Sequence, residues 1–441
     1  MNEKSGEENN IMEKIVSLCK RRGFVFQGSE IYGGLAGTWD YGPYGAELAN
    51  NIKNLWWKMF VSDREDMYGI DAAIIMHPKA WESSGHVHGY GFADPLVECK
   101  KCHHRFRADQ LDNNNVCPDC SGELGEQTHF NLMFKTNVGT GDDISYLRPE
   151  TAGGIFVNYK NIIDSIHPKI PFGMAQIGKA FRNEIAPRDF VFRSREFRQM
   201  EVEYFIDPKD WEKSFEEWRN IILSWCKEIG LNMEHVHELE VEEKDRAFYS
   251  KRTIDFEFDY PFGRKELYGL AYRTDHDLKA HSTGSSVDLD YYDEETKDRF
   301  TPHVIEPSLG VDRTILAVLC DSYVEDDLGG DERVYLKFLP KIAPVKIAVF
   351  PLLKNKSELV GKAREVYKVL KKEFGAVVFD DNGNIGKRYR RQDEIGTPWC
   401  VTVDFETIEK DGSVTMRDRD TGEQKRMSVE EVVSFVKTQL S

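Results

Sequence analysis

Four cysteines within one short segment carry the most specific chemical pattern in the sequence. Cys99-x-x-Cys102 is followed by a 14-residue interval and then by Cys117-x-x-Cys120. Two such pairs can present four thiolates tetrahedrally to one Zn²⁺ ion. With four protein ligands the site would be structural, and it would fasten a small ribbon over residues 95–125 that is inserted in a larger domain. Reduced cysteines without a metal are the alternative interpretation.

A second cluster of chemically capable side chains follows a predicted pair of antiparallel strands within residues 176–206. Alternation with a period of two puts Gln176, Arg182 and Glu184 on one face of the first strand. The second strand gives a matching row: Arg193, Phe197, Gln199, Glu201 and Glu203. Burying such charges without partners would cost several kcal/mol each. The rows therefore favour a face that binds a ligand with anionic and cationic groups, and a solvated face with surface ion pairs is the alternative.

These residues, together with a later segment, resemble signature motifs of the class II aminoacyl-tRNA synthetases. The second motif of that class is similar to Phe181-Arg182-Asn183-Glu184, a loop and Arg193-x-x-x-Phe197, and the third is similar to Glu306-Pro307-Ser308-Leu309-Gly310-Val311-Asp312-Arg313. The local sequence in these motifs most resembles that of the homodimeric bacterial glycyl-tRNA synthetases. Matching stretches run from about residue 11 to the C-terminus, so the resemblance covers nearly the whole chain.

The resemblance implies an enzyme of protein synthesis. It would activate glycine with ATP to glycyl-adenylate, release pyrophosphate, and transfer glycine to the 3′ end of tRNA(Gly). ATP is then a substrate, Mg²⁺ a cofactor and Zn²⁺ a structural ion, and the chain would form a homodimer. The rival readings are a non-catalytic, synthetase-like protein that binds nucleic acid, a class II synthetase for another amino acid, and a zinc-ribbon DNA-binding protein.

The same resemblance implies an ATP site. Arg182 would bind the α-phosphate, Arg193 and Arg313 would hold the β- and γ-phosphates, and Glu266 would carry Mg²⁺. Phe197 would stack on the adenine ring. The implied ATP-binding set is Arg182, Asn183, Glu184, Phe192, Arg193, Phe197, Glu266, Leu267, Gly310, Val311, Asp312 and Arg313, and its catalytic members are Arg182, Glu184 and Arg313.

A glycine site is implied beside it. Glu150 and Glu201 would pair with the ammonium group, and Ser308 would stand where a longer side chain begins. A filled pocket would exclude larger amino acids by overlap, so no editing domain would be needed. One departure is Gly153, which stands where the family usually has Gln. The implied glycine-binding set is Arg107, Glu150, Phe197, Gln199, Glu201, Glu306, Ser308 and Gly310.

The remaining histidines and cysteines of interest carry no assigned chemistry. His77, His86 and His88 are interpreted as loop or core residues, because no carboxylate stands at metal-ligand spacing. The other cysteines are interpreted as free, buried thiols: Cys19, Cys226, Cys320 and Cys400.

The elements that position these residues are predicted from periodicity. Helices are expected over residues 11–22 and 47–61, with a glycine-rich stretch of tight turns, 33–45, between them. Trp56, Trp57 and Phe60 are too many aromatics for an exposed face. They indicate core packing or a subunit interface, and the resemblance favours the interface because the family's first motif builds the dimer.

The expected fold class is α+β, with two main domains. Residues 1–340 would form a class II catalytic domain with an antiparallel sheet, including the zinc ribbon and a helical insertion over residues 207–252. Residues 341–441 alternate strands and helices and would form an α/β anticodon-binding domain. Its basic run, 386–394, contains Tyr389 among arginines and would suit RNA, although a solvated basic helix is the alternative.

Charge and hydropathy restrict the function classes further. The net charge of −17 argues against a general nucleic-acid coat. Residues 341–441 nevertheless carry +3, against −20 for the remainder, so a polyanion should meet the C-terminal part. No apolar run approaches the roughly 18 residues that span a bilayer, and the N-terminus is polar. We therefore expect no membrane partner and a cytoplasmic location.

Overall fold

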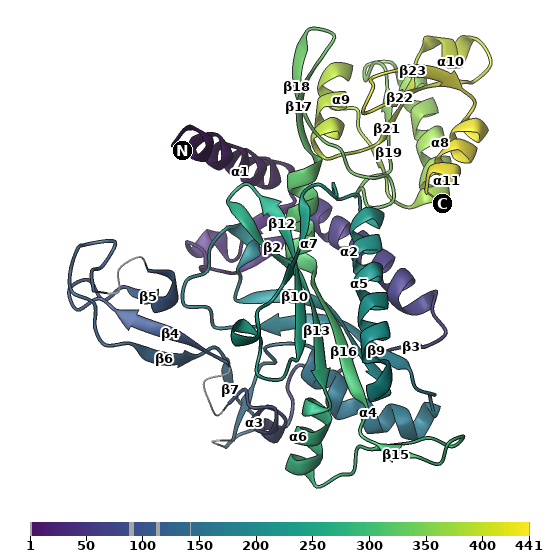
Figure 1. Cartoon of the computed structure of the whole chain (residues 1–441). Helices are drawn as coiled ribbons and strands as arrows, with labels where there is room; N and C mark the ends of the chain where they lie inside the picture. The colour runs from purple at the N-terminus through teal and green to yellow at the C-terminus, as the bar shows by residue number, and fades with distance from the viewer. Residues whose placement is uncertain (1, 88–91, 112–114, 142, 441) are drawn as a thin grey trace.

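The computed structural model describes residues 2–87, 92–111, 115–141 and 143–440 of the chain. Figure 1 shows a large body built around a central sheet, a ribbon that projects from one side of it, and a smaller C-terminal body. The large body and the C-terminal body have separate hydrophobic cores. No described helix is both long and apolar enough to cross a membrane.

The central sheet is antiparallel apart from one edge. Within the described residues it has seven strands in the order β11-β12-β13-β16-β10-β9-β3, and only β3 pairs in parallel with its neighbour. The strands are β3 (Met67–Gly69), β9 (Phe172–Phe181), β10 (Glu196–Ile206), β11 (Val236–Glu240), β12 (Arg252–Tyr260), β13 (Gly263–Thr274) and β16 (His303–Gly310). The predicted antiparallel catalytic sheet is therefore confirmed.

The predicted hairpin is also present, but its strands are shorter than expected. Strands β9 and β10 pair with Gln176 opposite Glu201. Because β9 ends before Arg182 and β10 begins after Arg193, the prediction that Arg182, Glu184 and Arg193 lie on strand faces is wrong. These three residues belong to the polar connection between the strands, where the chain leaves the regular ladder.

The two faces of β10 meet different helices. Met200 and Val202 point into the main core with helices α5 and α7, whereas Phe205 joins the core under α4 and α6. Alternation then puts Gln199 and Glu201 on the same face as Phe205. The helices are α4 (Ala152–Ile166), α5 (Trp211–Glu228), α6 (His276–Ser285) and α7 (Val311–Ser322). The polar row therefore faces the α4 side of the sheet.

The aromatic helix of the N-terminal part packs inside the chain. Helix α2 (Pro43–Trp57) continues as a π-helical turn, Lys58–Ser62. Trp56 and Phe60 are fully buried in the main core, and their rings stack with centroids 4.9 Å apart. For these two residues the interface interpretation is wrong, because the space around them is filled by the chain itself.

Residues 207–252 do not form a separate helical insertion. Helix α5 packs against β13 and β16, and strand β11 forms an edge of the central sheet. Trp218, Ile222 and Trp225 are buried along one face of α5. The predicted insertion is therefore corrected, since the segment covers one face of the sheet and extends its edge.

The remaining parts of the large body are small. A three-stranded sheet, β5-β4-β6, forms the projecting ribbon. The outstanding elements are α1 (Asn2–Arg22), β1 (Val25–Gln27), β2 (Trp39–Tyr41), α3 (Pro78–Ser83), β4 (Ala93–Glu98), β5 (Arg105–Arg107), β6 (Thr128–Asn131), β7 (Lys135–Asn137), β8 (Ile144–Tyr146), β14 (Tyr291–Tyr292), β15 (Arg299–Phe300), β17 (Tyr323–Leu328) and β18 (Asp331–Leu336).

The C-terminal body is a mixed α/β layer, as predicted. Its strands lie in the order β20-β19-β21-β22-β23, with the first three parallel. A capping box joins Ser428 and Glu431, each side chain accepting from the backbone N–H of the other residue. The elements are β19 (Ile347–Pro351), α8 (Ser357–Phe374), β20 (Val377–Phe379), α9 (Ile385–Glu394), β21 (Trp399–Val403), α10 (Phe405–Glu409), β22 (Val414–Asp418), β23 (Gln424–Met427) and α11 (Val429–Leu440).

The basic run of this body lies on α9, and only one of its basic side chains, Arg388, is buried. Arg388 is 1% exposed and donates to the carbonyl oxygens of Pro351, Asp381 and Gly383. The hydroxyl of Tyr389 contacts Thr402 Oγ1 at 2.7 Å. The interpretation of these two residues as an RNA-stacking surface is therefore wrong, because Arg388 is buried with both terminal nitrogens bonded within the chain and the Tyr389 hydroxyl contacts Thr402.

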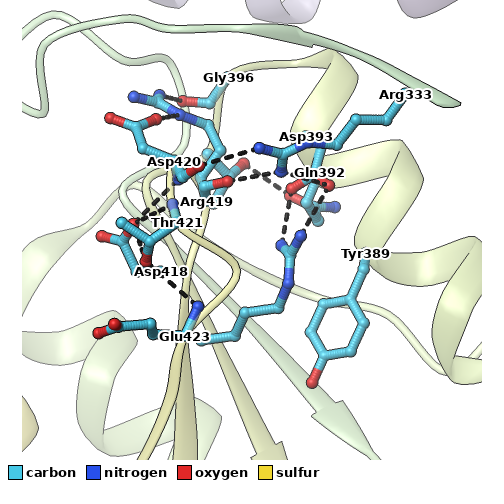
Figure 2. Close-up of polar contacts among 12 residues, drawn as sticks. Arg333, Tyr389, Gln392, Asp393, Gly396, Asp418, Arg419, Asp420, Thr421 and Glu423 are labelled. Atoms are coloured by element: carbon cyan, nitrogen blue, oxygen red, sulfur yellow. Dashed lines mark hydrogen bonds and ion pairs between the residues drawn. The ribbon is translucent and has the colours of Figure 1, made fainter. Parts of the chain in front are cut away.

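A buried carboxylate ties α9 to its surroundings (Figure 2). Asp393 accepts two hydrogen bonds from Arg417, at 2.8 and 3.0 Å, and its Oδ2 lies 3.5 Å from Arg333 of the β17–β18 hairpin. Arg419 donates to the carbonyl oxygens of Gly396 and Phe338. The network joins the C-terminal sheet, α9 and the hairpin of the large body through charged groups.

Candidate active site

A cavity of about 390 Å³ opens where the hairpin connection, β13 and the β16–α7 junction meet. It is lined mainly by side chains that the sequence singled out. They include Arg107, Arg182, Glu184, Phe192, Arg193, Phe197, Gln199, Glu266, Leu267, Ser308, Gly310, Asp312 and Arg313. Residues from widely separated parts of the sequence thus share one concave surface, which is typical of a ligand site.

Guanidinium groups converge on this cavity. Arg182 donates from Nε to the carbonyl oxygen of Pro149 at 3.0 Å, and its guanidinium lies over the Phe197 ring at 5.3 Å. Arg313 pairs with Glu266 at 3.2 Å and covers the Phe192 ring at 4.6 Å. Carbonyl, carboxylate and aromatic contacts therefore fix the direction in which each guanidinium points.

The third arginine, Arg193, has a nitrogen that makes no hydrogen bond among the described residues. Arg193 Nη1 lies 3.7 Å from Glu184 Oε2, and both atoms are buried without a hydrogen-bond partner among the described residues. Burial lowers the pKa of Arg193, and the Glu184 carboxylate acts against that shift. Buried donors that the chain leaves unsatisfied are suited to an anionic ligand such as a phosphate.

Phe192, Phe197 and Leu267 supply the apolar walls of the cavity. Phe192 packs edge-on against Tyr260 at 5.2 Å, which holds its ring in place. Flat aromatic surfaces next to guanidinium groups can take a planar base while the arginines take its phosphates. The cavity therefore has the chemistry that a nucleotide requires.

A second cavity of about 260 Å³ continues from the first and is lined by Glu150, Glu201 and Glu306. Glu201 is buried and accepts from Ser308 Oγ at 2.7 Å and from Thr151 Oγ1 at 2.5 Å. Gln199 Nε2 also donates to Glu201, at 3.2 Å. The row predicted on β10 therefore meets β16 at this point.

One buried arginine serves several carboxylates around this narrower cavity. Arg273 Nη1 donates to Glu306 at 2.7 Å, and the same guanidinium makes two 2.8 Å bonds to Asp277. Burial raises the pKa of Glu306 to about 8, and burial likewise raises that of Glu201. Carboxylates outnumber the arginines that line this cavity, so it is suited to an ammonium group.

Glu203 extends this acidic row into the protein. It is fully buried, and neither of its carboxylate oxygens has a hydrogen-bond partner among the described residues. Burial, and then the neighbouring Glu306, raise the pKa of Glu203 well above the ordinary value. Glu203 therefore adds a neutral acid, rather than a charge, behind the cavity.

His86 is a site residue that the sequence reading missed. Its Nε2 lies 3.5 Å from Glu150 Oε2, and its Nδ1 lies 2.8 Å from Ser84 Oγ. Burial acts to raise the pKa of Glu150, but His86, together with Arg273 and Arg182, acts against burial and brings that pKa down to about 2. His86 is buried, as expected for a loop or core residue, but its carboxylate partner Glu150 comes from a distant segment and leaves no local signal in the sequence. His88 lies outside the described residues.

Several predicted ligands occupy other positions. Arg107 lines the wider cavity and pairs with Asp94 at 2.7 Å, so it lies with the nucleotide-type residues and not in the narrower cavity. Val311 is fully buried in the main core and cannot contact a ligand. Asn183 is not among the residues that line the two cavities, and its backbone N–H donates to the carbonyl oxygen of Leu132.

The presence of glycine at position 153, where the family usually has glutamine, has a local steric explanation. A Cβ at this position would lie 2.7 Å from the indole of Trp81, which is buried beneath α4. A glutamine here would require the indole to move. The departure from the usual family residue is therefore matched by the packing of Trp81.

The ribbon brings the predicted metal ligands together. The Sγ atoms of Cys99, Cys102, Cys117 and Cys120 lie within 4.8 Å of one another, and two of the pairs are 3.5 and 3.7 Å apart. A tetrahedral zinc site with Zn–S bonds of about 2.3 Å requires sulfur atoms about 3.8 Å apart. Backbone N–H groups of Lys101 and Cys102 also point at Cys99 Sγ. The donor set and its spacing fit Zn²⁺.

Comparison with known proteins agrees with this geometry. Residues 134–322 match the family described as tRNA synthetase class II core domain (G, H, P, S and T), and residues 346–439 match the anticodon binding domain. The glycine–tRNA ligase of Clostridium acetobutylicum is 48% identical over 98% of this chain and 100% of its own. That of Treponema denticola is 50% identical over 97% of each chain, and that of Lachnospira eligens is 49% identical over 96% of this chain and 98% of its own.

These matches confirm the resemblance found in the motifs. They span both bodies of the molecule, and the class II core match contains the hairpin and the β16–α7 junction that form the cavities. On this evidence the chain belongs to the glycine–tRNA ligases of the class II aminoacyl-tRNA synthetases.

Proposed function

We propose that this chain activates glycine with ATP, forming glycyl-adenylate and pyrophosphate, and then transfers glycine to the 3′ end of tRNA(Gly). The observation that carries this proposal is the shared wall of the two cavities, to which Arg182, Glu266 and Ser308 all contribute. One cavity offers arginines to a triphosphate, and the other offers carboxylates to an ammonium group. At their junction a glycine carboxylate would meet the α-phosphorus.

The first step needs no protein nucleophile. A glycine carboxylate oxygen attacks the α-phosphorus, the bond to the bridging oxygen of the β-phosphate breaks, and pyrophosphate leaves. Arg182 would neutralise charge at the reacting phosphate, and Arg193 and Arg313 would hold the leaving group. Glu266, beside Arg313, would hold Mg²⁺, which when bound supplies further neutralisation of phosphate charge. Glu184 would contact the adenine, with Phe197 stacked on it.

Glycine would be held by charge and by limited space. Glu150 and Glu201 would receive its ammonium group, with Glu306 and Gln199 beside them. The hydrogen bond between Ser308 and Glu201 occupies the position from which a side chain would grow. A larger amino acid would have to break this buried contact, which supports rejection at binding without an editing site.

Zn²⁺ is proposed as a structural ion in the ribbon. When bound by the four cysteines it would fix the ribbon on which Asp94 and Arg107 line the wider cavity. Elemental analysis of freshly purified protein should give one zinc per chain, and Cys99→Ser should lower that content. Finding no zinc in the unaltered protein would remove the claim.

The partners and domain boundary follow from the family. We propose tRNA(Gly) as the polynucleotide partner, residues 341–441 as the anticodon-binding domain, and the cytoplasm as the location. We also propose a homodimer. Its support is an apolar turn between β1 and β2, in which Ile31 and Tyr32 are 88% and 87% exposed. Sedimentation of the full chain would test the dimer.

An amino-acid panel in ATP–pyrophosphate exchange tests the function. Glycine alone should support exchange, and tRNA(Gly) should then be charged. Exchange with another amino acid would identify a synthetase of different specificity. Tight tRNA binding without exchange would support the rival accessory protein instead.

A further inference from the structure

The glycine-rich stretch before α2 touches both segments that carry the phosphate-type arginines. Strand β2 ends at Tyr41, which lies at the start of α7 and within reach of Asp312. Further back, Gly37 and Ala36 accept hydrogen bonds of 2.7 Å each from the backbone and side chain of Arg195. Arg195 also donates to the carbonyl oxygen of Glu184. The stretch therefore lies behind the cavity, on the protein side of its arginines.

Asp312 is the centre of the contact between this stretch and α7. It is 6% exposed, and its Oδ1 accepts from the Tyr41 hydroxyl at 2.5 Å. Its Oδ2 accepts from the backbone N–H of Arg198 at 2.6 Å, and Arg198 Nη1 lies 3.4 Å from Oδ1. The Arg198 guanidinium in turn covers the Tyr41 ring at 4.5 Å. Three donors from two strands thus hold one carboxylate.

This arrangement argues against Asp312 as a nucleotide ligand, which is the role the motif implied. Both of its oxygens already accept hydrogen bonds from the chain. An additional carboxylate turned toward a triphosphate would repel it. Burial raises the pKa of Asp312, and the contacts with Arg198 and Tyr41 act against that shift. The carboxylate is therefore directed at the protein and is kept there by its donors.

We propose that Tyr41 is a positioning residue that aims Arg313 at the nucleotide through Asp312. This inference rests on the proposed function. Asp312 lies in the first turn of α7 and Arg313 follows it directly, so fixing the Asp312 carboxylate fixes the rotation of that turn. Arg313 then points along Glu266 and Phe192 into the cavity. The glycine-rich stretch is thereby assigned to support of the phosphate site and not to contact with phosphate.

Tyr41→Phe is the principal test, because it keeps the ring against Arg198 and removes only the donor. We expect the KM for ATP in glycine-dependent pyrophosphate exchange to rise about tenfold, since one hydrogen bond to a charged group is lost. The KM for glycine should change less than about twofold, because the carboxylates around the narrower cavity are untouched. Tyr292→Phe, which alters a tyrosine 47% exposed on β14, is the matched control and should leave both constants unchanged.

A double-mutant cycle distinguishes positioning from a general structural effect. Asp312→Asn should raise the KM for ATP at least as much as Tyr41→Phe, and the double variant should be no worse than Asp312→Asn alone. Additive effects would overturn the proposed route through Asp312. Equal losses for ATP and glycine, together with a lower melting temperature, would overturn the positioning role. If the unaltered chain failed to use glycine in the amino-acid panel, the proposed function would fail independently of this result.

Discussion

Two arginine-rich regions of this molecule use the same side chain in opposite ways. Around the wider cavity, Arg182, Arg193 and Arg313 contact aromatic rings and single carboxylates, and buried Arg193 Nη1 has no hydrogen-bond partner among the described residues. In the C-terminal body, Arg388 and Arg417 direct their donors at carbonyl oxygens and a buried carboxylate. The first region is open to an anion, whereas in the second most donors bond within the chain, and Arg388 Nε is the buried exception without a hydrogen-bond partner among the described residues.

The difference shows that the local density of arginine in a sequence does not identify a ligand site. The basic run of α9 is the densest in the chain, yet its most buried member caps loops of its own domain. The arginines of the cavity are scattered over more than a hundred residues. What separates the two groups is the number of acceptors that the fold brings to each guanidinium.

The largest expected effect is the loss of stability in Asp393→Ala, which tests whether the arginines of the C-terminal body are structural. If the C-terminal arginines are structural, removing Asp393 leaves buried Arg417 without its ion-pair partner, although Arg333 keeps Asp326, and should cost about 3–5 kcal/mol of stability. Urea unfolding, with hydrogen exchange of peptides from residues 385–419, would measure that loss. Glycine-dependent exchange by the folded fraction should persist, because the cavities lie in the other body.

Asp331→Ala provides the matched control for that variant. Asp331 is 85% exposed and lies 3.8 Å from Arg390, so its loss should cost less than about 1 kcal/mol. Equal stability for the two variants would mean that the Asp393 network is not structural. The arginines of the C-terminal body could then no longer be described as structural, in contrast to those of the wider cavity.

Sequence reasoning reached the sheet and most of the cavity because both leave local signals. Alternation identified the β9–β10 hairpin, and within each of the two motifs the residues that line the cavity stand close together in sequence. Asp312 and Val311 show the limit of that reasoning. They belong to the same motif as Arg313, yet the helix turn directs one at Tyr41 and the other into the core.

Contacts between segments that are distant in sequence could not be predicted from periodicity or motifs. His86 meets Glu150 across 64 residues, and Arg388 donates to carbonyl groups at the end of β19 and in the segment after β20. Such partners are set by how strands cross in the sheet, and no periodicity encodes them. The cysteine pairs succeeded because their spacing alone defines the ligand geometry.

Arg182→Ala tests whether the arginines of the wider cavity act on an anionic ligand. Loss of this guanidinium should lower glycine-dependent pyrophosphate exchange about 10²- to 10³-fold, because charge developing at the α-phosphate is no longer neutralised. The melting temperature should change little, since the guanidinium makes one hydrogen bond to the chain, to Pro149, and lines both cavities. Arg364→Ala is the control: it removes an arginine stacked 3.5 Å over Phe379 in the C-terminal body. Exchange that is unchanged in Arg182→Ala would reject the assigned role.

The smallest effect concerns the carboxylates of the narrower cavity. In the C-terminal network Asp393 is shared by two arginines, whereas Glu306 and Asp277 together share Arg273, and Glu201 accepts hydrogen bonds only from neutral donors among the described residues. Because burial raises the pKa of Glu306 to about 8, the glutamate is largely protonated at neutral pH. A folded-state pKa above the unfolded one means that this group's contribution to stability is lost as pH rises toward 8.

Glycine should therefore bind better as the pH rises. About one tenth of Glu306 is ionised at pH 7 and about half at pH 8, so an ammonium group that needs the ionised form should show a KM for glycine about fivefold lower at pH 8. Exchange at saturating ATP between pH 6.5 and 8.5 would measure the profile. Glu306→Gln cannot ionise at this position and should flatten it while raising the KM throughout. If the pH dependence of the KM for glycine were the same in Glu306→Gln, another group would be responsible for the titration. The shortage of cations around Glu306 would then not govern glycine binding.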